Sequence, residues 1–318
     1  MLKKHQKELA LAGLLLIICI SLSIKEPNFL SPNNLKNMAN LIGMYGILGV
    51  GVAVVIVTGG IDLSVGSSCA LLGVLLSLGL AQAGGSPIIV LPGVILVGGL
   101  LGWVHGLLIT KLKLQPFIVT LCGLLIYRGA ARFISNDETK GFSDSKGFEG
   151  VKQFVTSTPL GIPMSFWILL VTALLVGILI HKTVYGRHLF ALGKNAEAAR
   201  YAGVNVMKVE GAAYVVAGLC TGLAAILFAV YTNSIAPSSH GNFYELYGIA
   251  AAVLGGFSLR GGEGSVVGVL LGTALLQLLQ NLVNLLGIPS SLNFAVMGVV
   301  ILLGVLAERV WAMKQQAA

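Results

Sequence analysis

The sequence has very few charged residues. Only 10% of its 318 residues are Asp, Glu, Lys or Arg, whereas 56% are hydrophobic. Soluble domains carry roughly 25% charged residues, so a water-soluble fold of this length could not cover its surface. Repeated apolar runs of about 17–25 residues are typical of membrane-spanning helices. The composition therefore predicts an all-α, polytopic transmembrane helical bundle.

Cysteine is scarce as well. The four cysteines, Cys19, Cys69, Cys122 and Cys220, all lie inside apolar segments, and no CxxC or other ligand spacing is present. We interpret them as small packing residues and expect no disulfide framework and no metal site.

Motifs for energy conversion and catalysis are absent too. The sequence has no GxxxxGK[ST] phosphate-binding loop, so the chain should carry no ATP of its own and no other cofactor. It has no HExxH and no Ser-His-Asp order, so we expect no catalytic residues and no enzyme activity. The polar loop near 134–164 is too small to be a solute-binding domain. Energy and solute capture would both have to come from partner proteins.

The apolar segments predict about ten spans within a single transmembrane domain, residues 1–318. The segment at 245–256 is too short to cross about 30 Å of hydrocarbon, so we expect a broken or re-entrant helix there. The lysine-rich start resembles a signal peptide, but no convincing cleavage site follows, which favours a retained anchor. The expected spans are 9–24, 38–57, 63–82, 87–110, 116–133, 165–181, 207–231, 245–256, 265–286 and 292–307.

The basic residues indicate the orientation. Placing the N-terminus inside puts most of the 20 Lys and Arg residues on the cytoplasmic side, which the positive-inside rule favours. Both termini should then be cytoplasmic. The basic loop at 182–206 would face the cytoplasm, and the acidic loop near 134–164 would lie outside. The basic residues left outside are Lys25, Lys36, Arg128, Arg132, Lys140, Lys146 and Lys152.

A polar stretch at 186–203 interrupts the apolar chain inside that basic loop. Asn195 suits the N-cap of a short helix, Glu197 suits its first turn, and Gly203 suits the position after its end. Glu197 and Arg200 are spaced to pair. The helix would present a flat face of small side chains, made by Ala198, Ala199 and Ala202. It suits docking into a groove of another protein, or else an amphipathic connector at the membrane surface.

Asp62 is a carboxylate between two apolar segments. Intramembrane carboxylates are costly and are functional candidates by default. Asp62 could instead N-cap the helix that begins near Leu63, with help from Ser64. The alternative is a role for Asp62 and Ser64 in gating the pathway or contacting sugar hydroxyls.

Four amides form a stripe on the segment at 265–286. Their spacing places them on one helical face, which in lipid must turn towards another helix or water. Neutral amides suit the hydroxyls of an uncharged sugar, but they could equally hold helices together. These residues are Gln277, Gln280, Asn281 and Asn284.

Further polar residues have simpler readings. Arg128 and Arg132, one turn apart, favour snorkelling to the outer headgroups, with a contact in an outer vestibule as the alternative. His105 should be a hydrogen-bonded packing residue, and Glu245 should line the outer pore or lie at the interface. The strings GGIDLS at 59–64 and GGFSLR at 255–260 echo each other. Such an echo often marks a transport pathway, or it is a coincidence in a glycine-rich chain.

Several strings resemble a known family. Glu197-Ala198-Ala199 followed by Gly203 resembles the start of the EAA…G signature of permease subunits of bacterial ABC importers, without its later Ile-x-Leu-Pro. GIDLSVGS at 60–67, ALG at 191–193 with EAAR at 197–200, and LGGFSLRGG at 254–262 look like hallmark strings of the ribose/xylose/arabinose permease family. The resemblance runs from about Phe29 to Leu306.

The resemblance implies an inner-membrane permease of a monosaccharide importer. Its implied partners are a cytoplasmic ATP-binding subunit, a periplasmic sugar-binding protein and a second permease copy or paralogue. The ATP-binding subunit would engage the loop at 182–206; the residues expected to couple are Gly193, Lys194, Asn195, Glu197, Ala198, Ala199, Arg200 and Gly203. An ion-gradient-driven secondary transporter is the alternative, although more charged residues in mid-span would then be expected.

Overall fold

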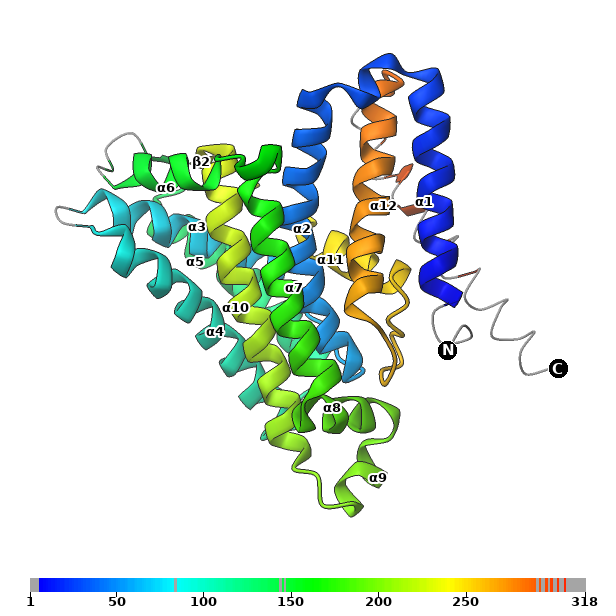
Figure 1. Cartoon of the computed structure of the whole chain (residues 1–318). Coiled ribbons are helices and arrows are strands. Elements are labelled where there is room, and N and C mark those ends of the chain that lie inside the picture. The colour runs from blue at the N-terminus through cyan, green and yellow to red at the C-terminus, as the bar shows by residue number, and fades with distance from the viewer. Residues whose placement is uncertain are drawn as a thin grey trace.

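The computed structural model describes residues 6–82, 85–142, 145, 147–289 and a few isolated positions between 292 and 306. This part of the chain is almost entirely helical, which confirms the predicted all-α bundle (Figure 1). The expected span at 292–307 and the loop residue Lys146 lie largely outside the described residues.

Among the described helices, seven are long and apolar enough to cross a membrane. They coincide with seven of the expected spans, including the one at 116–133. They are α1 (Gln6–Lys25), α2 (Pro32–Val57), α4 (Pro87–Thr110), α5 (Pro116–Ile134), α7 (Met164–Lys182), α10 (Val206–Thr232) and α12 (Val266–Leu285).

Two apolar helices are shorter, α3 (Val65–Ala81, 17 residues) and α11 (Tyr244–Leu254, 11 residues). At about 1.5 Å per residue they rise about 25 Å and about 16 Å, less than a hydrocarbon core of about 30 Å. The prediction of a short helix near 245–256 is confirmed. α3 matches the expected span at 63–82 to within two residues, and at 17 residues it lies at the short end of the range for a spanning helix. The chain leaves α2 through Gly59, whose φ of +82° ends that helix, and stays non-helical up to Ser64.

Small elements complete the two ends of the bundle. The loop at 182–206 forms α8 (Val184–Lys194) and α9 (Ala196–Tyr201). At the opposite end lie α6 (Phe148–Val155) and the short strands β1 (Lys140–Gly141) and β2 (Ser234–Ile235), which pair antiparallel (Figure 1). Two 3-10 turns, Pro27–Leu30 and Pro159–Gly161, precede α2 and α7.

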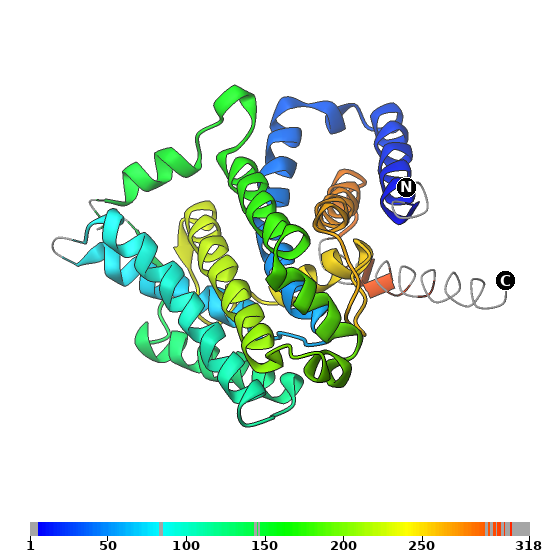
Figure 2. The same cartoon turned by 60° about the horizontal axis from the view of Figure 1, so that its bottom comes forward.

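Helices α2 and α10 form the centre of the bundle. α2 packs against α7, α10, α11 and α12, and α10 packs most extensively against α4. Glycines allow α4 and α10 to approach this closely, because a Cβ at Gly98 or Gly218 would collide with the backbone of the facing helix. α1 packs mainly on α12 at one edge (Figure 2). The bundle thus surrounds α2 with helices that bring its two ends to the sites described next.

Candidate functional site

The helix pair α8 and α9 has its ends fixed by its own side chains. Asn195 Oδ1 accepts the backbone N–H of Ala198 at 2.9 Å, and Asn195 is the N-cap of α9, as the sequence predicts. Gly203 follows the helix end with a φ of +84°, which also confirms its predicted position. Thr183 caps α8 in the same way by accepting Gly186 N–H at 3.2 Å.

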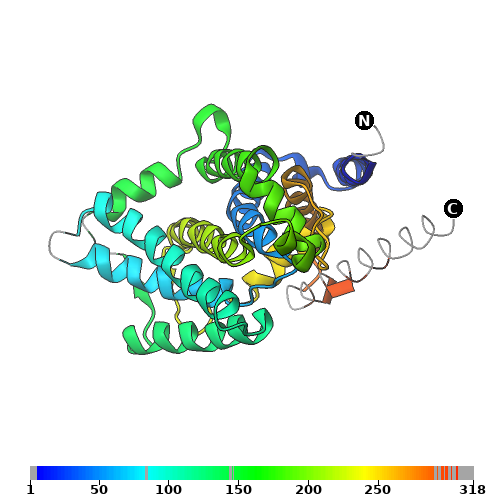
Figure 3. The same cartoon turned by 90° about the horizontal axis from the view of Figure 1, so that it is seen from below.

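Three glycine strings that are far apart in the sequence meet beside α9. A Cβ at Gly193 would collide with Val57 O and Gly262 N. Gly262 N donates to Val57 O at 2.8 Å. Gly261 and Gly262 have φ of +84° and +74°, which glycine adopts freely. The ends of α2 and α8 and the loop from α11 to α12 therefore touch through backbone, in the region that Figure 3 shows from below.

The outward surface of α9 differs in part from the expected flat face. Ala199 is buried, whereas Ala198, Ala202 and both charged side chains are exposed. Glu197 and Arg200 form no ion pair among the described residues. The expected pair is therefore wrong; at exposed positions such a pair would contribute little. Lys194 and Asn195 are also exposed.

Tyr201 is a residue that the sequence reading missed. Its side chain is 91% exposed on this surface. A large aromatic residue at the end of a docking helix would have been the signal for it.

Asp62 does not cap α3 directly. The N-cap is Ser64, whose side chain makes no capping bond. Asp62 Oδ1 instead accepts the backbone N–H of Ser64 at 2.9 Å and its hydroxyl at 2.7 Å. The prediction that Asp62 is the N-cap is therefore wrong by two positions. The Asp62 carboxylate closes the turn that precedes α3, and the helix begins after that turn. Both residues are buried.

A small cavity lies beside this turn, with room for about one water molecule. His105 Nε2 is 2.9 Å from the hydroxyl of Tyr127, so it is the hydrogen-bonded packing residue that was expected. The cavity is too narrow for a sugar in this conformation. It is lined by Asp62, Ser64, Val65, Ser68, Gly98, Leu101, Gly102, His105, Gly218 and Thr221.

The amide stripe of α12 does not reach this cavity, and its members have different surroundings. Gln280 Nε2 donates to Tyr247 Oη at 2.5 Å, and Asn281 exchanges hydrogen bonds with Asn34 at 2.6 and 3.1 Å. These two residues join α12 to α11 and α2. Asn284 is exposed.

Gln277 is 2% exposed, and neither amide atom has a hydrogen-bond partner among the described residues.

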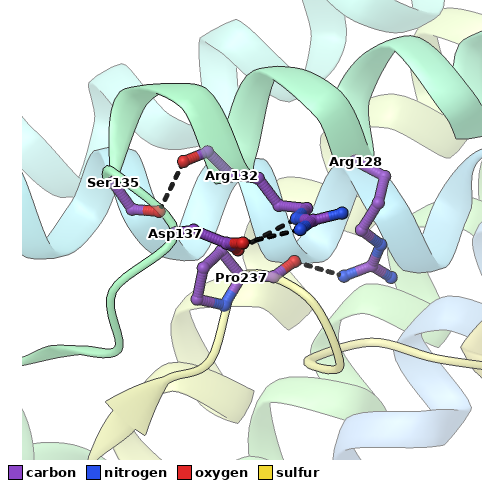
Figure 4. Close-up of polar contacts among 5 residues, drawn as sticks. All are labelled: Arg128, Arg132, Ser135, Asp137 and Pro237. Atoms are coloured by element: carbon purple, nitrogen blue, oxygen red, sulfur yellow. Dashed lines mark hydrogen bonds and ion pairs between the residues drawn. The ribbon is translucent and has the colours of Figure 1, made fainter.

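Both arginines of α5 bond to groups of the protein (Figure 4). Snorkelling to the headgroups stays a prediction for the exposed Arg132, whereas Arg128 is held by the protein. Arg128 donates to Pro237 O at 2.9 Å, to His240 O at 2.6 Å and to Asn242 Oδ1 at 2.9 Å. It thereby fixes the loop that precedes α11.

Arg132 donates to both carboxylate oxygens of Asp137, at 2.9 and 2.6 Å, which lowers the pKa of that carboxyl. Both side chains are about half exposed, so the pair contributes little to stability.

Glu245 is buried at the start of α11, and its carboxylate lies against Gly66 at the start of α3. The same glycine touches Gly241, since a Cβ on either residue would collide with the other's carbonyl oxygen. The two short helices therefore meet at their N-terminal ends inside the bundle. Because an N-terminus carries partial positive charge, the carboxylate is placed where that charge stabilises it.

Comparison with known proteins identifies the chain. Residues 34–305 match the model of a family described as branched-chain amino acid transport system / permease component. The chain belongs to this family. It is a permease component of a transport system and a multi-pass membrane protein of the bacterial inner membrane.

Curated relatives carry more specific names. The chain is 38% identical to the ribose import permease protein RbsC of Escherichia coli K12, over 94% of this chain and 92% of that one. It is 34% identical to the L-arabinose ABC transporter permease protein AraH of Azospirillum brasilense, over 92% and 85%. It is 32% identical to the autoinducer 2 import system permease protein LsrD of Photorhabdus laumondii, over 97% and 92%. No solved structure matches the chain.

Membership in a permease family indicates that the two sites, one at α8 and α9 and one where α3 meets α11, belong to one transport protein. The junction of α8 and α9 lies at one end of the bundle, and the meeting point of α3 and α11 lies within it. The sequence reading named residues at both sites but did not predict that Arg128 would connect α5 to the loop before α11. Two arginines one turn apart were the visible signal, but the partners of Arg128 are more than 100 positions away in the sequence.

Proposed function

We propose that this permease is the membrane-spanning subunit of an ATP-binding-cassette importer that carries a monosaccharide, a ribose-like sugar, across the inner membrane. Both termini would be cytoplasmic. The start of α1 supports this orientation, because the Lys7 side chain lies close to Gly256, at the same end of the bundle as α8 and α9.

The observation that carries the proposal is the contact of α8 with the end of α2. The short, capped, exposed helix α9 follows α8 directly at Asn195. Through Gly193, α8 makes backbone contacts with the core helix α2 and with the loop from α11 to α12. A partner that pushes on α9 would therefore displace several membrane helices together. Such an arrangement suits a chain that couples to ATP hydrolysis elsewhere, with ATP bound by the partner subunit.

The relatives support a sugar rather than the amino acid of the family description. An amino acid carries a carboxylate and an ammonium group, which require charged partners when they are desolvated. The amide stripe of α12 carries no charge. A neutral sugar needs only donors and acceptors, which Gln277, Gln280, Asn281 and Asn284 would provide once the helix contacts of Gln280 and Asn281 open. Asp62 and Ser64 would act further along the same pathway, once its cavity opens.

The remaining partners follow from what the chain lacks. A periplasmic sugar-binding protein would deliver the solute to the end that carries α6, and a second permease copy or paralogue would complete the membrane unit. ATP hydrolysis would then rock the helices between outward and inward openings.

The test uses the complete transporter, reconstituted with its ATP-binding subunit and binding protein, and measures ATP-dependent uptake of radiolabelled ribose. Glu197→Lys reverses the charge on α9, and Gly203→Pro cannot adopt the φ of +84° at its end. Each should abolish uptake while the protein remains inserted.

The matched control is Glu138→Lys, the same charge reversal on the exposed outer loop, which should transport normally. Wild-type uptake by both α9 variants would contradict the coupling role. Uptake without any ATP-binding subunit would instead support the ion-gradient alternative.

A further inference from the structure

Gln277 is a buried amide without a partner. Both of its polar side-chain atoms are buried and unbonded among the described residues. An unpaired buried amide is destabilising, because it gives up its hydrogen bonds to water and gains none in return. An apolar side chain of the same size would avoid this cost, so the amide suggests a partner that this conformation lacks.

Neighbouring contacts show what Gln277 faces. Thr273, one turn before it, packs against Gly49 of α2, and Asn281, one turn after it, bonds to Asn34 of α2. Residues four apart share a helix face. Gln277 is therefore bracketed by two contacts with α2, at Gly49 and at Asn34. Tyr45 lies between these two positions of α2, on the same face as Gly49.

Tyr45 is the centre of an aromatic group drawn from three helices. Its ring centroid lies 4.8 Å from that of Tyr247 and 5.3 Å from that of Tyr244, both on α11. It lies 5.0 Å from the ring of Phe228 on α10. The hydroxyl of Tyr247 accepts from Gln280, one turn beyond Gln277. We name the tyrosine–amide cluster for Tyr45, Tyr231, Tyr244, Tyr247, Gln277 and Gln280.

Within the cluster, exposure to solvent decreases from Tyr231 at the surface to Gln277 in the interior. Tyr231 is 46% exposed at the end of α10 and donates to Asn37, near the start of α2. Tyr45 and Tyr244 are half-buried, and Tyr247 is 7% exposed. Because the start of α2 and the end of α10 lie opposite α8 and α9, this path begins at the outer end (Figure 1).

The cluster contains no charged side chain. Glu245, although it is next to Tyr244 in sequence, turns its carboxylate to Gly66 of α3. Aromatic faces offer apolar contact and tyrosine hydroxyls offer hydrogen bonds, while amides both donate and accept. Such a surface suits a neutral ligand that has C–H faces and several hydroxyls.

We propose that the tyrosine–amide cluster contacts the transported sugar within this subunit, with Gln277 as the buried group that bonds its hydroxyls. This inference rests on the proposed function. In the structure the helices close over the cluster. When they separate, Tyr231 and Tyr45 meet the sugar first and Gln277 bonds it last.

The test measures ribose uptake by the complete transporter, with Gln277→Met and with Tyr45→Phe and Tyr45→Leu. Methionine has nearly the volume of glutamine but cannot bond a hydroxyl, so Gln277→Met should lower uptake at least about tenfold. Its unfolding temperature should not fall, because a buried unpaired amide is removed. Tyr45→Phe keeps the ring and should retain more uptake than Tyr45→Leu.

The control variant Gln82→Met makes the same change at the exposed end of α3 and should transport as the wild type does. A cysteine at Tyr231, in a chain whose four native cysteines are alanine, gives a second measurement. It should react with a water-soluble maleimide, and saturating ribose should slow that reaction.

Full uptake by both Gln277→Met and Tyr45→Leu would overturn the inference while leaving the proposed function intact. Labelling at position 231 that ribose does not change, in a protein that transports ribose, would also overturn it. Failure of the wild type to move ribose, arabinose or xylose would overturn the proposed function itself, and the inference with it.

Discussion

The two short helices α3 and α11 meet at their N-termini, yet they begin in different ways. α3 begins after a turn that Asp62 closes within two residues of itself. α11 begins after Phe243, which has a φ of +66°, and no capping side chain bonds its first turn. The loop before it is fixed by Arg128 of α5 instead.

This difference shows where the bundle depends on tertiary contacts. The start of α3 is encoded by neighbouring residues and should persist as other helices move. The start of α11 depends on a side chain more than 100 positions away, so α5 and α11 should move as a unit. The contact of Gly66 with Gly241 joins the two helices at one point.

The largest effect is expected from a variant that disrupts the contact between Gly66 and Gly241. In Gly66→Val the new side chain would collide with Gly241 O and the Glu245 carboxylate. Overpacking typically costs 1–3 kcal/mol, and here backbone must move, so we expect a loss of about 3 kcal/mol or more. Thermal unfolding of the purified protein measures it. Gly129→Val, where a Cβ would meet nothing within 4 Å, is the control and should unfold as the wild type does.

The next test releases the start of α11. Arg128→Gln loses charge-assisted hydrogen bonds to two backbone carbonyls, each with a net worth of about 1.5–3 kcal/mol. We expect unfolding at least about 2 kcal/mol easier and faster hydrogen exchange of the amides in the loop before α11. Arg132→Gln, which breaks only an exposed pair, should change neither measurement. Equal effects of the two variants would refute the assigned role of Arg128.

The smallest effect is expected at α3. Asp62→Ala removes the local acceptor of the turn, a change that costs about 1 kcal/mol at comparable helix starts. Asp62→Asn keeps an acceptor oxygen and should recover most of the stability. If Asp62→Ala were as damaging as Arg128→Gln, the start of α3 would not be local. Uptake measured in parallel separates this structural role from a role on the pathway.

The sequence was sufficient where structure is local. Seven of the roughly ten spans predicted from long apolar runs coincide with long helices among the described residues, and cap chemistry placed Asn195 and Gly203 correctly. The sequence reading placed the start of α3 two residues too early, because the turn before the helix depends on how Gly59 and Asp62 arrange the backbone. It also could not show that Gly193 touches Val57 and Gly262, or that Arg128 bonds the loop before α11. These contacts join segments far apart in the chain, and no local pattern encodes them.

The amide stripe illustrates the same limit at a candidate site. Spacing alone put Gln277, Gln280, Asn281 and Asn284 on one face, and that face is real. Spacing could not distinguish the two residues that join helices from the one left unbonded. That distinction depends on which neighbour lies opposite each turn of α12.

The backbone contacts at Gly193 have a mechanical consequence. Flexible side chains between two helices absorb small displacements by changing rotamer, so part of any movement is lost. Where Gly193, Val57 and Gly262 touch, no side chain intervenes, and the joint has very little compliance. A shift at α8 should therefore pass directly to the end of α2 and to the loop before α12. Any larger residue at position 193 would alter both the spacing and the stiffness of this joint.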